Sequence, residues 1–309
     1  MQKISFTSNF NKILLILFII GLFGYSFQLI FESKIILTNK TSAPYKIHRI
    51  LYENHLNEIP IFGSSRAEGT FIPTRLGSKY YNYGISGIRD NVILFFLNEE
   101  CKKKKNTPIV INFDMEGLSN SIGDPNNYIL NCNNSDIKKL MDTDYQFYYS
   151  IPIIKYYGNY MFFLKEFLNS KMMLTKYQEN GASIEKNILI KEKFDKLVIE
   201  RNQTTTTFNN NKQLEINFIN IIRSHPERKF ILIIPPYHKS YFTKYYNMSN
   251  AKIFFKNLNS MKNVSILNYS QLEYNDSLYF NTTHLNYNGA IQFCKLIKPD
   301  LDSVISTSK

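Results

Sequence analysis

IPIFGSSRAEG, residues 59–69, joins a short apolar run to a glycine–serine turn and then to a polar segment. Such a run, bounded by such a turn, predicts a buried strand followed by a change of direction into a helix. Strand, turn and helix in this order form the repeating unit of α/β proteins. Ser65 is therefore expected at the carboxyl end of a strand, with its hydroxyl exposed and its amide facing an oxyanion site. An ordinary turn that caps a helix is the alternative interpretation.

Four more apolar runs predict strands, and three segments between them have the apolar spacing of helices. The alternation of the two kinds of element predicts a parallel sheet covered on both faces, with right-handed crossovers. We therefore expect an α/β fold, a three-layer sandwich around a five-stranded parallel, flavodoxin-like sheet. The further strands are Lys79–Tyr83, Pro108–Phe113, Phe230–Ile234 and Val264–Asn268, and the helical segments are Ile88–Glu100, Leu214–Ile222 and Ala251–Leu258.

The N-terminal region contains an uncharged stretch, residues 13–31. As a helix it would be about 28 Å long, close to the thickness of the hydrocarbon core of a bilayer. We expect a single-pass membrane protein with its N-terminus inside and its main domain extracytoplasmic; a cleaved signal peptide is the alternative. The predicted organisation is an anchor (1–32), a polar linker (33–56) and an α/β domain (57–309) with a helical insertion at about 115–210. The insertion includes the aromatic-rich segment Tyr145–Leu168.

The charge and cysteine content exclude several classes of function. The formal net charge is +12, but the only tight basic run, Lys102–Lys105, follows a predicted helix, where cations suit the negative end of the helix dipole. No base-reading motif accompanies the charge, so we expect anionic lipid or an acidic envelope polymer nearby and no nucleic acid. The three cysteines show no spacing typical of zinc. We therefore expect neither a metal nor a cofactor.

Two other motifs follow predicted strands, at the edge where parallel α/β proteins place their sites. In YNYGISG, residues 81–87, Gly84 is a candidate for a second oxyanion donor through its backbone amide. In DSLYFNTTHLNYNGA, residues 276–290, His284 precedes a predicted C-terminal helix and is a candidate base. Alone, the first motif is more typical of a tight turn into a helix capped by Ser86, and a lone histidine is more often a surface or core residue than a catalytic one.

In this order the three motifs resemble the SGNH (GDSL-like) hydrolase superfamily over roughly residues 57–300. Ser65 matches the family's nucleophilic serine, Gly84 the glycine of its second block and His284 the histidine of its terminal D-x-x-H block. GSSR is similar to its envelope-acting branches, which include D-alanine transfer proteins of teichoic acid synthesis and alginate-type O-acetylation proteins. The resemblance implies a serine esterase or O-acyltransferase for a cell-envelope glycan or glycolipid. It also implies a membrane acyl-transfer protein as a partner.

The chain departs from the family pattern at two positions. Asn281 replaces the aspartate three residues before the histidine, and an amide can orient an imidazole but hardly stabilises its positive charge. Either Asp276 replaces that aspartate from the same loop, or the site works as a Ser–His dyad. In the third block, Glu116 occupies the place of the family's asparagine, while Asn112 lies within the predicted strand. Asp114 is expected to form a polar wall of the cleft.

Two further residues have competing interpretations. Arg66 either supports the oxyanion or binds an anionic substrate, or it forms a surface ion pair with Glu68 or Asp90. His238, after the fourth strand, either touches substrate or is an incidental loop residue. Because of the departures at Asn281 and in the third block, a catalytically impaired SGNH-like protein that binds glycan or scaffolds an envelope complex remains the alternative to the enzyme. A structural protein in which every motif is a turn is a third class.

Overall fold

The central element of the computed structural model is a five-stranded sheet; the structure describes residues 6–119, 160–172, 176–186 and 190–307. The strands are ordered β2-β1-β3-β7-β9 and all pair in parallel. The predicted α/β fold with a five-stranded parallel sheet is confirmed, and every strand lies within one of the predicted apolar runs. The strands are β1 (Ile59–Phe62), β2 (Tyr80–Asn82), β3 (Ile109–Asn112), β7 (Phe230–Ile234) and β9 (Val264–Asn268).

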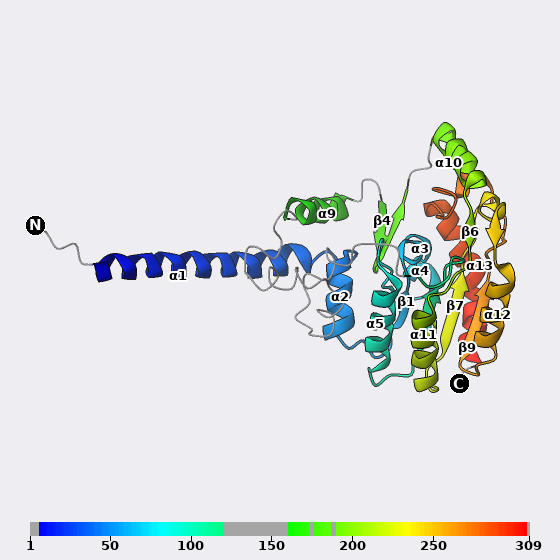
Figure 1. Ribbon diagram of the computed structural model, residues 1–309, viewed down its shortest axis with the longest axis horizontal. Helices are drawn as coiled ribbons and strands as arrows, with labels where there is room; N and C mark the ends of the chain where they lie inside the picture. Colours follow the sequence, from blue (N-terminus) through cyan, green and yellow to red (C-terminus); the bar gives the residue numbers. More distant parts are fainter. Residues whose placement is uncertain (1–5, 120–159, 173–175, 187–189, 308–309) are drawn as a thin grey trace, which may run out of the picture.

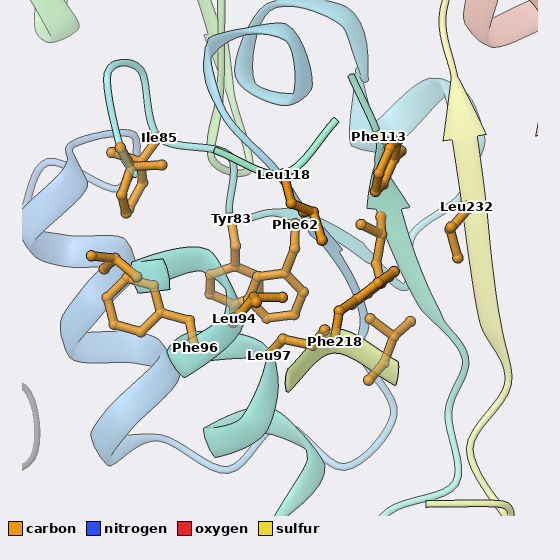
Figure 2. Packing of buried hydrophobic residues seen from close by; sticks show 14 of the residues in the cluster. Phe62, Tyr83, Ile85, Leu94, Phe96, Leu97, Phe113, Leu118, Phe218 and Leu232 are labelled. Carbon is orange, nitrogen blue, oxygen red and sulfur yellow. The ribbon is translucent and has the colours of Figure 1, made fainter. Parts of the chain in front are cut away.

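Helices cover both faces of this sheet, because successive side chains along each strand point to opposite faces. One cluster of buried side chains joins Phe62 and Leu232 to α2 (Ala43–Tyr52), α5 (Asp90–Cys101), α11 (Lys212–Ser224) and α12 (Met248–Asn259). Figure 2 shows part of this cluster, with Phe218 close to the sheet side chains. The second cluster joins Ile61 and Ile231 to α3 (Ser65–Thr70), α4 (Pro73–Leu76) and α13 (Tyr287–Ser306). The result is a three-layer sandwich.

The N-terminal helix α1 (Phe6–Phe31) continues into one π-helical turn, η1 (Glu32–Ile36), and projects away from the body (Figure 1). Its apolar side chains are exposed; Phe18, for example, is 68% exposed. Residues 9–36 form the one described helix with the length and apolar character needed to cross a bilayer. Near its end, the rings of Phe27 and Phe31 contact Tyr160 of α9 (Tyr160–Met172).

The expected polar linker, residues 33–56, is partly a packed helix. Helix α2 occupies residues 43–52, and its Ile47 and Ile50 are buried against α5 in the core. Ser42 caps this helix by accepting a hydrogen bond from the Tyr45 amide, and Pro44 lies in its first turn. Serine before a first-turn proline is a local helix-start signal, and this signal could have identified α2 from the sequence.

The expected helical insertion also contains strands, although residues 120–159 and with them the first part of Tyr145–Leu168 lie outside the described residues. An antiparallel hairpin, β4 (Lys176–Glu179) and β5 (Ala182–Glu185), turns at Asn180 and Gly181, both with positive φ. Asn-Gly is the strongest short-range signal for such a turn. Ala182 and Ile184 pack in the same cluster as Ala67 of α3, so the hairpin covers the helix that begins with Ser65.

The rest of this interval packs beside the sheet. Helix α10 (Lys191–Gln203) leads to β6 (Thr206–Thr207), which pairs with β8 (Tyr245–Tyr246). Two short 3₁₀ turns, η2 (Lys239–Phe242) and η3 (Asp276–Leu278), precede β8 and α13 respectively. Because the sheet is parallel, the segments that follow β1, β2, β3 and β7 all leave from the same edge. This edge holds the candidate site.

Candidate active site

The turn between β1 and α3 places Ser65 at the first position of the helix. Gly63 has a φ of +149°, and a Cβ built on it would lie 2.7 Å from Ala67 Cβ and 2.8 Å from Asn112 Cβ. Only glycine fits this close approach of helix and strand. Ser64 occupies the N-cap, but its hydroxyl donates to Asp114 Oδ2 at 3.1 Å and does not cap α3. The Ser65 amide, as the first of the helix, has no intrahelical acceptor and lies beside the Ser65 hydroxyl.

The structure brings Ser65 and His284 together from positions 219 residues apart in the chain. Ser65 Oγ lies 2.9 Å from His284 Nε2. The loop that carries His284 is tight, since the amides of Phe280 and Asn281 both donate to the His284 carbonyl. It is joined directly to α13, whose N-cap Asn286 accepts a hydrogen bond from the Gly289 amide. The imidazole is thus held on a short, well-bonded segment.

Asn281 meets the far nitrogen of this imidazole. Its Oδ1 accepts hydrogen bonds from the backbone amides of Thr283 and His284, which identifies this atom as the oxygen. The same Oδ1 lies 3.0 Å from His284 Nδ1 and can only accept, so Nδ1 carries the proton. Nε2 is then the lone-pair nitrogen and accepts from the Ser65 hydroxyl. This is the tautomer that a general base needs.

The His284 environment keeps the ring neutral. Burial, together with the nearby charge of Arg66, lowers the pKa of His284 to about 4, and the carboxylates of Asp114 and Glu68 only partly oppose this shift. At neutral pH the imidazole is therefore unprotonated and able to accept a proton. A carboxylate at Nδ1 would stabilise the imidazolium, and the neutral Asn281 does so much less.

Asp276 does not take the place of the family's aspartate, because it partners His238 instead. Asp276 Oδ1 lies 3.2 Å from His238 Nε2, and the other ring nitrogen, Nδ1, lies 2.7 Å from Ser240 Oγ. His238 is buried, with its ring edge-on to Phe194 and Tyr279. His238 was expected either to touch substrate or to be an incidental loop residue, and the structure gives it a structural role in the loop after β7. It is a buried residue that ties η2 to η3, and its ring contacts neither Ser65 nor His284.

Arg66 is buried, which rules out the expected surface ion pair. Its Nε donates to the Thr283 carbonyl at 2.8 Å, Nη1 to Asp114 Oδ1 at 3.1 Å and Nη2 to the Pro235 and Pro236 carbonyls, each at 3.0 Å. The guanidinium also stacks on Tyr237, 3.5 Å from the ring centroid. Arg66 therefore ties α3 to the His284 loop and to the segment that follows β7. Its hydrogen bonds are directed at the protein, not at a substrate.

Asp114 links the loop after β3 to the serine turn. Besides Ser64 and Arg66, its carboxylate accepts from Asn112 Nδ2 at 2.9 Å. Asn112 lies at the end of β3 with its amide directed at Asp114, so the donor of the family's third block does not have its counterpart in a loop residue here. Glu116 stands where the family has asparagine, and burial together with the nearby Asp114 raises the pKa of its carboxyl. Only the protonated form of this carboxyl has a donor, so Glu116 differs from an asparagine amide, which donates at every pH.

Gly84 has a different function from the one expected. Its amide donates to Asn82 Oδ1 at 2.8 Å, so it is not free to bind an oxyanion. A Cβ at this position would lie 2.4 Å from the Glu68 amide nitrogen and 2.7 Å from Ala67 Cβ. Gly84 is therefore needed for the close packing of α3 on the turn after β2.

Lys46 of α2 is a residue of the site region that the sequence analysis missed. Its side chain is fully buried; Nζ forms an ion pair with Glu68 Oε1 at 2.8 Å and donates to the Gly84 carbonyl. Glu68 Oε2 in turn accepts from the Ser86 amide at 3.2 Å and from the Ser86 hydroxyl. One buried lysine thus connects α2, which follows the apolar N-terminal helix, to α3.

Lys46→Met is expected to lower the free energy of unfolding by about 3 kcal/mol, because it leaves the Glu68 carboxylate without its cation in a mostly buried position. Adding Glu68→Gln should restore part of the loss. Thermal and urea unfolding of the full chain in nanodiscs measure both effects. Lys40→Met, at an exposed position six residues before Lys46, is the control. Equal stability of the two methionine variants would contradict a stabilising role for the ion pair.

Comparisons with known proteins leave the family of the chain open. No family model matches it, and no curated protein matches its sequence. One similar solved structure, from Streptococcus pneumonia and provisionally described as a platelet activating factor, is 16% identical. The match covers 89% of this chain and 98% of that chain, with a TM-score of 0.40. A likeness at this level does not identify the function of the chain.

Proposed function

We propose that the chain is a serine esterase or O-acyltransferase in which Ser65 is the nucleophile and His284 the general base. The observation that carries this proposal is the 2.9 Å contact between Ser65 Oγ and His284 Nε2, with Asn281 on Nδ1. A nucleophile, a base in reach of it and a third group that orients the base form the arrangement used for nucleophilic catalysis. The order of the motifs along the chain, similar to that of SGNH hydrolases, agrees with this assignment.

In the proposed reaction, Ser65 Oγ attacks the carbonyl carbon of an acyl ester while its proton passes to His284 Nε2. The tetrahedral intermediate collapses, the ester C–O bond breaks, and the leaving alcohol takes the proton from Nε2. A water molecule or a sugar hydroxyl then loses its proton to Nε2 and attacks the acyl-serine, which returns Ser65 to its hydroxyl form. The Ser65 amide is the proposed oxyanion donor, since it lies at the first position of α3 and donates to no other described residue.

The proposed location and substrate follow from the N-terminal helix. We propose that α1 anchors the chain as a single pass, with the α/β body on the extracytoplasmic side. A tethered enzyme meets lipid-linked or surface-bound substrate at a raised local concentration. The proposed substrate is therefore an ester of a cell-envelope glycan or glycolipid, with a membrane acyl-transfer protein as a partner if the reaction is a transfer.

Labelling with a fluorophosphonate probe tests the proposed function directly. We expect the wild-type protein to be labelled, and we expect mass spectrometry to place the adduct on Ser65 and not on the neighbouring Ser64. Ser65→Ala should abolish labelling, while Ser78→Ala, an exposed serine away from α3, should leave it unchanged. Folded wild-type protein that takes no label would count against the enzyme.

The alternative is a catalytically impaired protein that binds glycan or scaffolds an envelope complex. The observation in its favour is the neutral Asn281 at the position where a carboxylate would stabilise the imidazolium. Failure of the wild type to react, combined with labelling of an Asn281→Asp variant, would support this alternative.

Asn281→Asp is expected to raise the pKa of His284 and to increase turnover at neutral pH by about tenfold, because a carboxylate stabilises the imidazolium formed in each step. The base works only when neutral. Its activity should therefore persist on acidification to about pH 4 in the wild type and be lost at a higher pH in the variant. The pH profile of kcat/KM for p-nitrophenyl acetate measures the shift. An acid limb that stays in place would contradict the contact between residue 281 and Nδ1.

A further inference from the structure

A cavity lies between α11 and α12, at the same edge of the sheet as the Ser65 site. It is a cavity of about 300 Å³, within the range of small-ligand sites. We propose that it binds a neutral sugar unit, so that the substrate of Ser65 is a glycan of more than one unit. Its role as a substrate subsite rests on the proposed function, but the binding of a sugar there does not require Ser65.

The lining of the cavity is rich in side-chain amides. Asn209, Asn247, Asn250 and Asn257 all line it, and all four are exposed. Their side chains form no hydrogen bond to any other described residue, and Asn247, the N-cap of α12, does not cap the helix with its amide. Each amide offers two donors and an acceptor, which suits hydroxyl groups that donate and accept at once. Four unpaired amides around one hollow therefore favour a polyhydroxylated ligand.

Apolar side chains form a small part of the cavity surface. Phe208 and Phe254 line it, both are almost fully buried, and their ring centroids lie 5.7 Å apart. Ile253, which is 59% exposed, completes the apolar part of the lining. A pyranose ring has an apolar C–H face and hydroxyls at its edge, and it can pack on Ile253 while its hydroxyls meet the amides. An acyl chain alone would leave those amides without partners.

The charge of the lining favours a neutral ligand. Glu215 is the only ionisable side chain among the described residues that line the cavity, and it accepts a hydrogen bond from Asn210 at 3.1 Å. No lysine or arginine is among those lining residues, so a phosphate or carboxylate would meet a like charge and no cation. We therefore exclude a polyanionic ligand from this cavity.

The loop after β3, residues 114–119, separates the cavity from the Ser65 site. At its start, Asp114 accepts from Ser64 and Arg66. At its end, the Leu118 amide donates to Asn210 Oδ1 at 2.8 Å, and the Glu116 carbonyl accepts from the Asn209 amide at 3.0 Å. A glycan that crosses this loop would present one unit to Ser65 and another to the cavity.

Saturation-transfer NMR on the full chain in nanodiscs tests the binding of a sugar. The probes are methyl β-D-glucopyranoside and N-acetylglucosamine, and the lipids carry no sugar headgroups. We expect saturation transfer to the sugar from the wild type and from Ser65→Ala. We expect this transfer to be lost with the double variant Asn250→Ala/Asn257→Ala. Asn259→Ala on the same helix, outside the cavity lining, is the matched control and should retain transfer. Absence of transfer in the wild type, or equal transfer in the double variant, would overturn the proposal.

Kinetics separate this proposal from the proposed function. With O-acetylated cellotriose, the double variant should raise KM about tenfold and leave kcat nearly unchanged, because it removes hydrogen bonds made equally in the ground and transition states. With p-nitrophenyl acetate, KM should not change. If the double variant hydrolyses both esters with the KM values of the wild type, the subsite is rejected, while the proposed Ser–His chemistry is supported. Saturation transfer to the sugars without hydrolysis of either ester would support the sugar site and count against the Ser–His chemistry.

Discussion

Ser65→Ala and His284→Ala are each expected to lower ester turnover by about 10³-fold or more, and the double variant is expected to be no slower than either single variant. The two side chains act as one unit, since the hydroxyl becomes a strong nucleophile only as its proton moves to Nε2, 2.9 Å away. Once one partner is gone, the other has nothing left to contribute. Initial rates with p-nitrophenyl acetate for the four proteins give the complete cycle.

The control for this cycle is His225→Ala, which removes a histidine at the end of α11 whose Nδ1 contacts the Ile221 carbonyl. Its rate should equal that of the wild type. Losses that multiply in the Ser65→Ala/His284→Ala double variant would mean that the two residues act independently, which the proposed mechanism does not allow.

The His284→Ala variant is also expected to change the pH dependence of stability, which can be measured without a substrate. An unfolded chain binds a proton at His284 near the ordinary pKa of 6.5, and the folded chain binds it only near 4. Acidification from pH 6.5 to 4 therefore favours the unfolded state through this residue, and stability rises with pH across that window. His284→Ala removes the contribution, so its stability should fall less steeply than that of the wild type between these pH values. Urea unfolding at several pH values measures the difference.

Arg66→Met is expected to lower the free energy of unfolding by about 3–5 kcal/mol, the largest stability effect we predict. Methionine keeps much of the length of the side chain but removes the guanidinium. The substitution leaves the Thr283, Pro235 and Pro236 carbonyls without their donor and the Asp114 carboxylate without its cation. Thermal unfolding followed by circular dichroism in nanodiscs measures the loss.

Two further variants determine what Arg66 contributes. Arg75→Met, at an exposed position on α4, is the matched control and should change stability by less than about 0.5 kcal/mol. Arg66→Lys keeps the charge but not the planar fork, so it should recover only part of the loss. If Arg66→Met were as stable as Arg75→Met, the buried hydrogen bonds of Arg66 would not hold the His284 loop.

The sheet could be predicted from the sequence because its information is local. Each strand is a short run of apolar residues, and burial on both faces of a parallel sheet needs little else. Helix α2 was missed because its polar side chains suggested a linker, although Ser42 and Pro44 mark its start. The β4–β5 hairpin was missed in the same way, although Asn180 and Gly181 are a strong turn signal.

The site also has some features that local sequence predicts and others that it does not. Ser65 and His284 were identified because each follows from a motif of a few residues, and parallel strands deliver such motifs to one edge of the sheet. The partners of the polar groups were not predictable, since they depend on distant segments. Asp276 is close to His284 in the sequence but bonds to His238, and the Gly84 amide is taken by Asn82.

From the sequence alone, then, come the α/β class, the apolar N-terminal helix and the pair Ser65 and His284, because hydrophobic pattern and short motifs are written in consecutive residues. Only the tertiary structure decides that Asn281 orients the imidazole, that Arg66 points into the protein and that Lys46 supports the nucleophile helix. The physical reason is that a buried donor, acceptor or charge must find a partner wherever the fold places one. Here the partners come from segments that are distant in the sequence, namely α2, α3, the loop after β3 and the loop before α13.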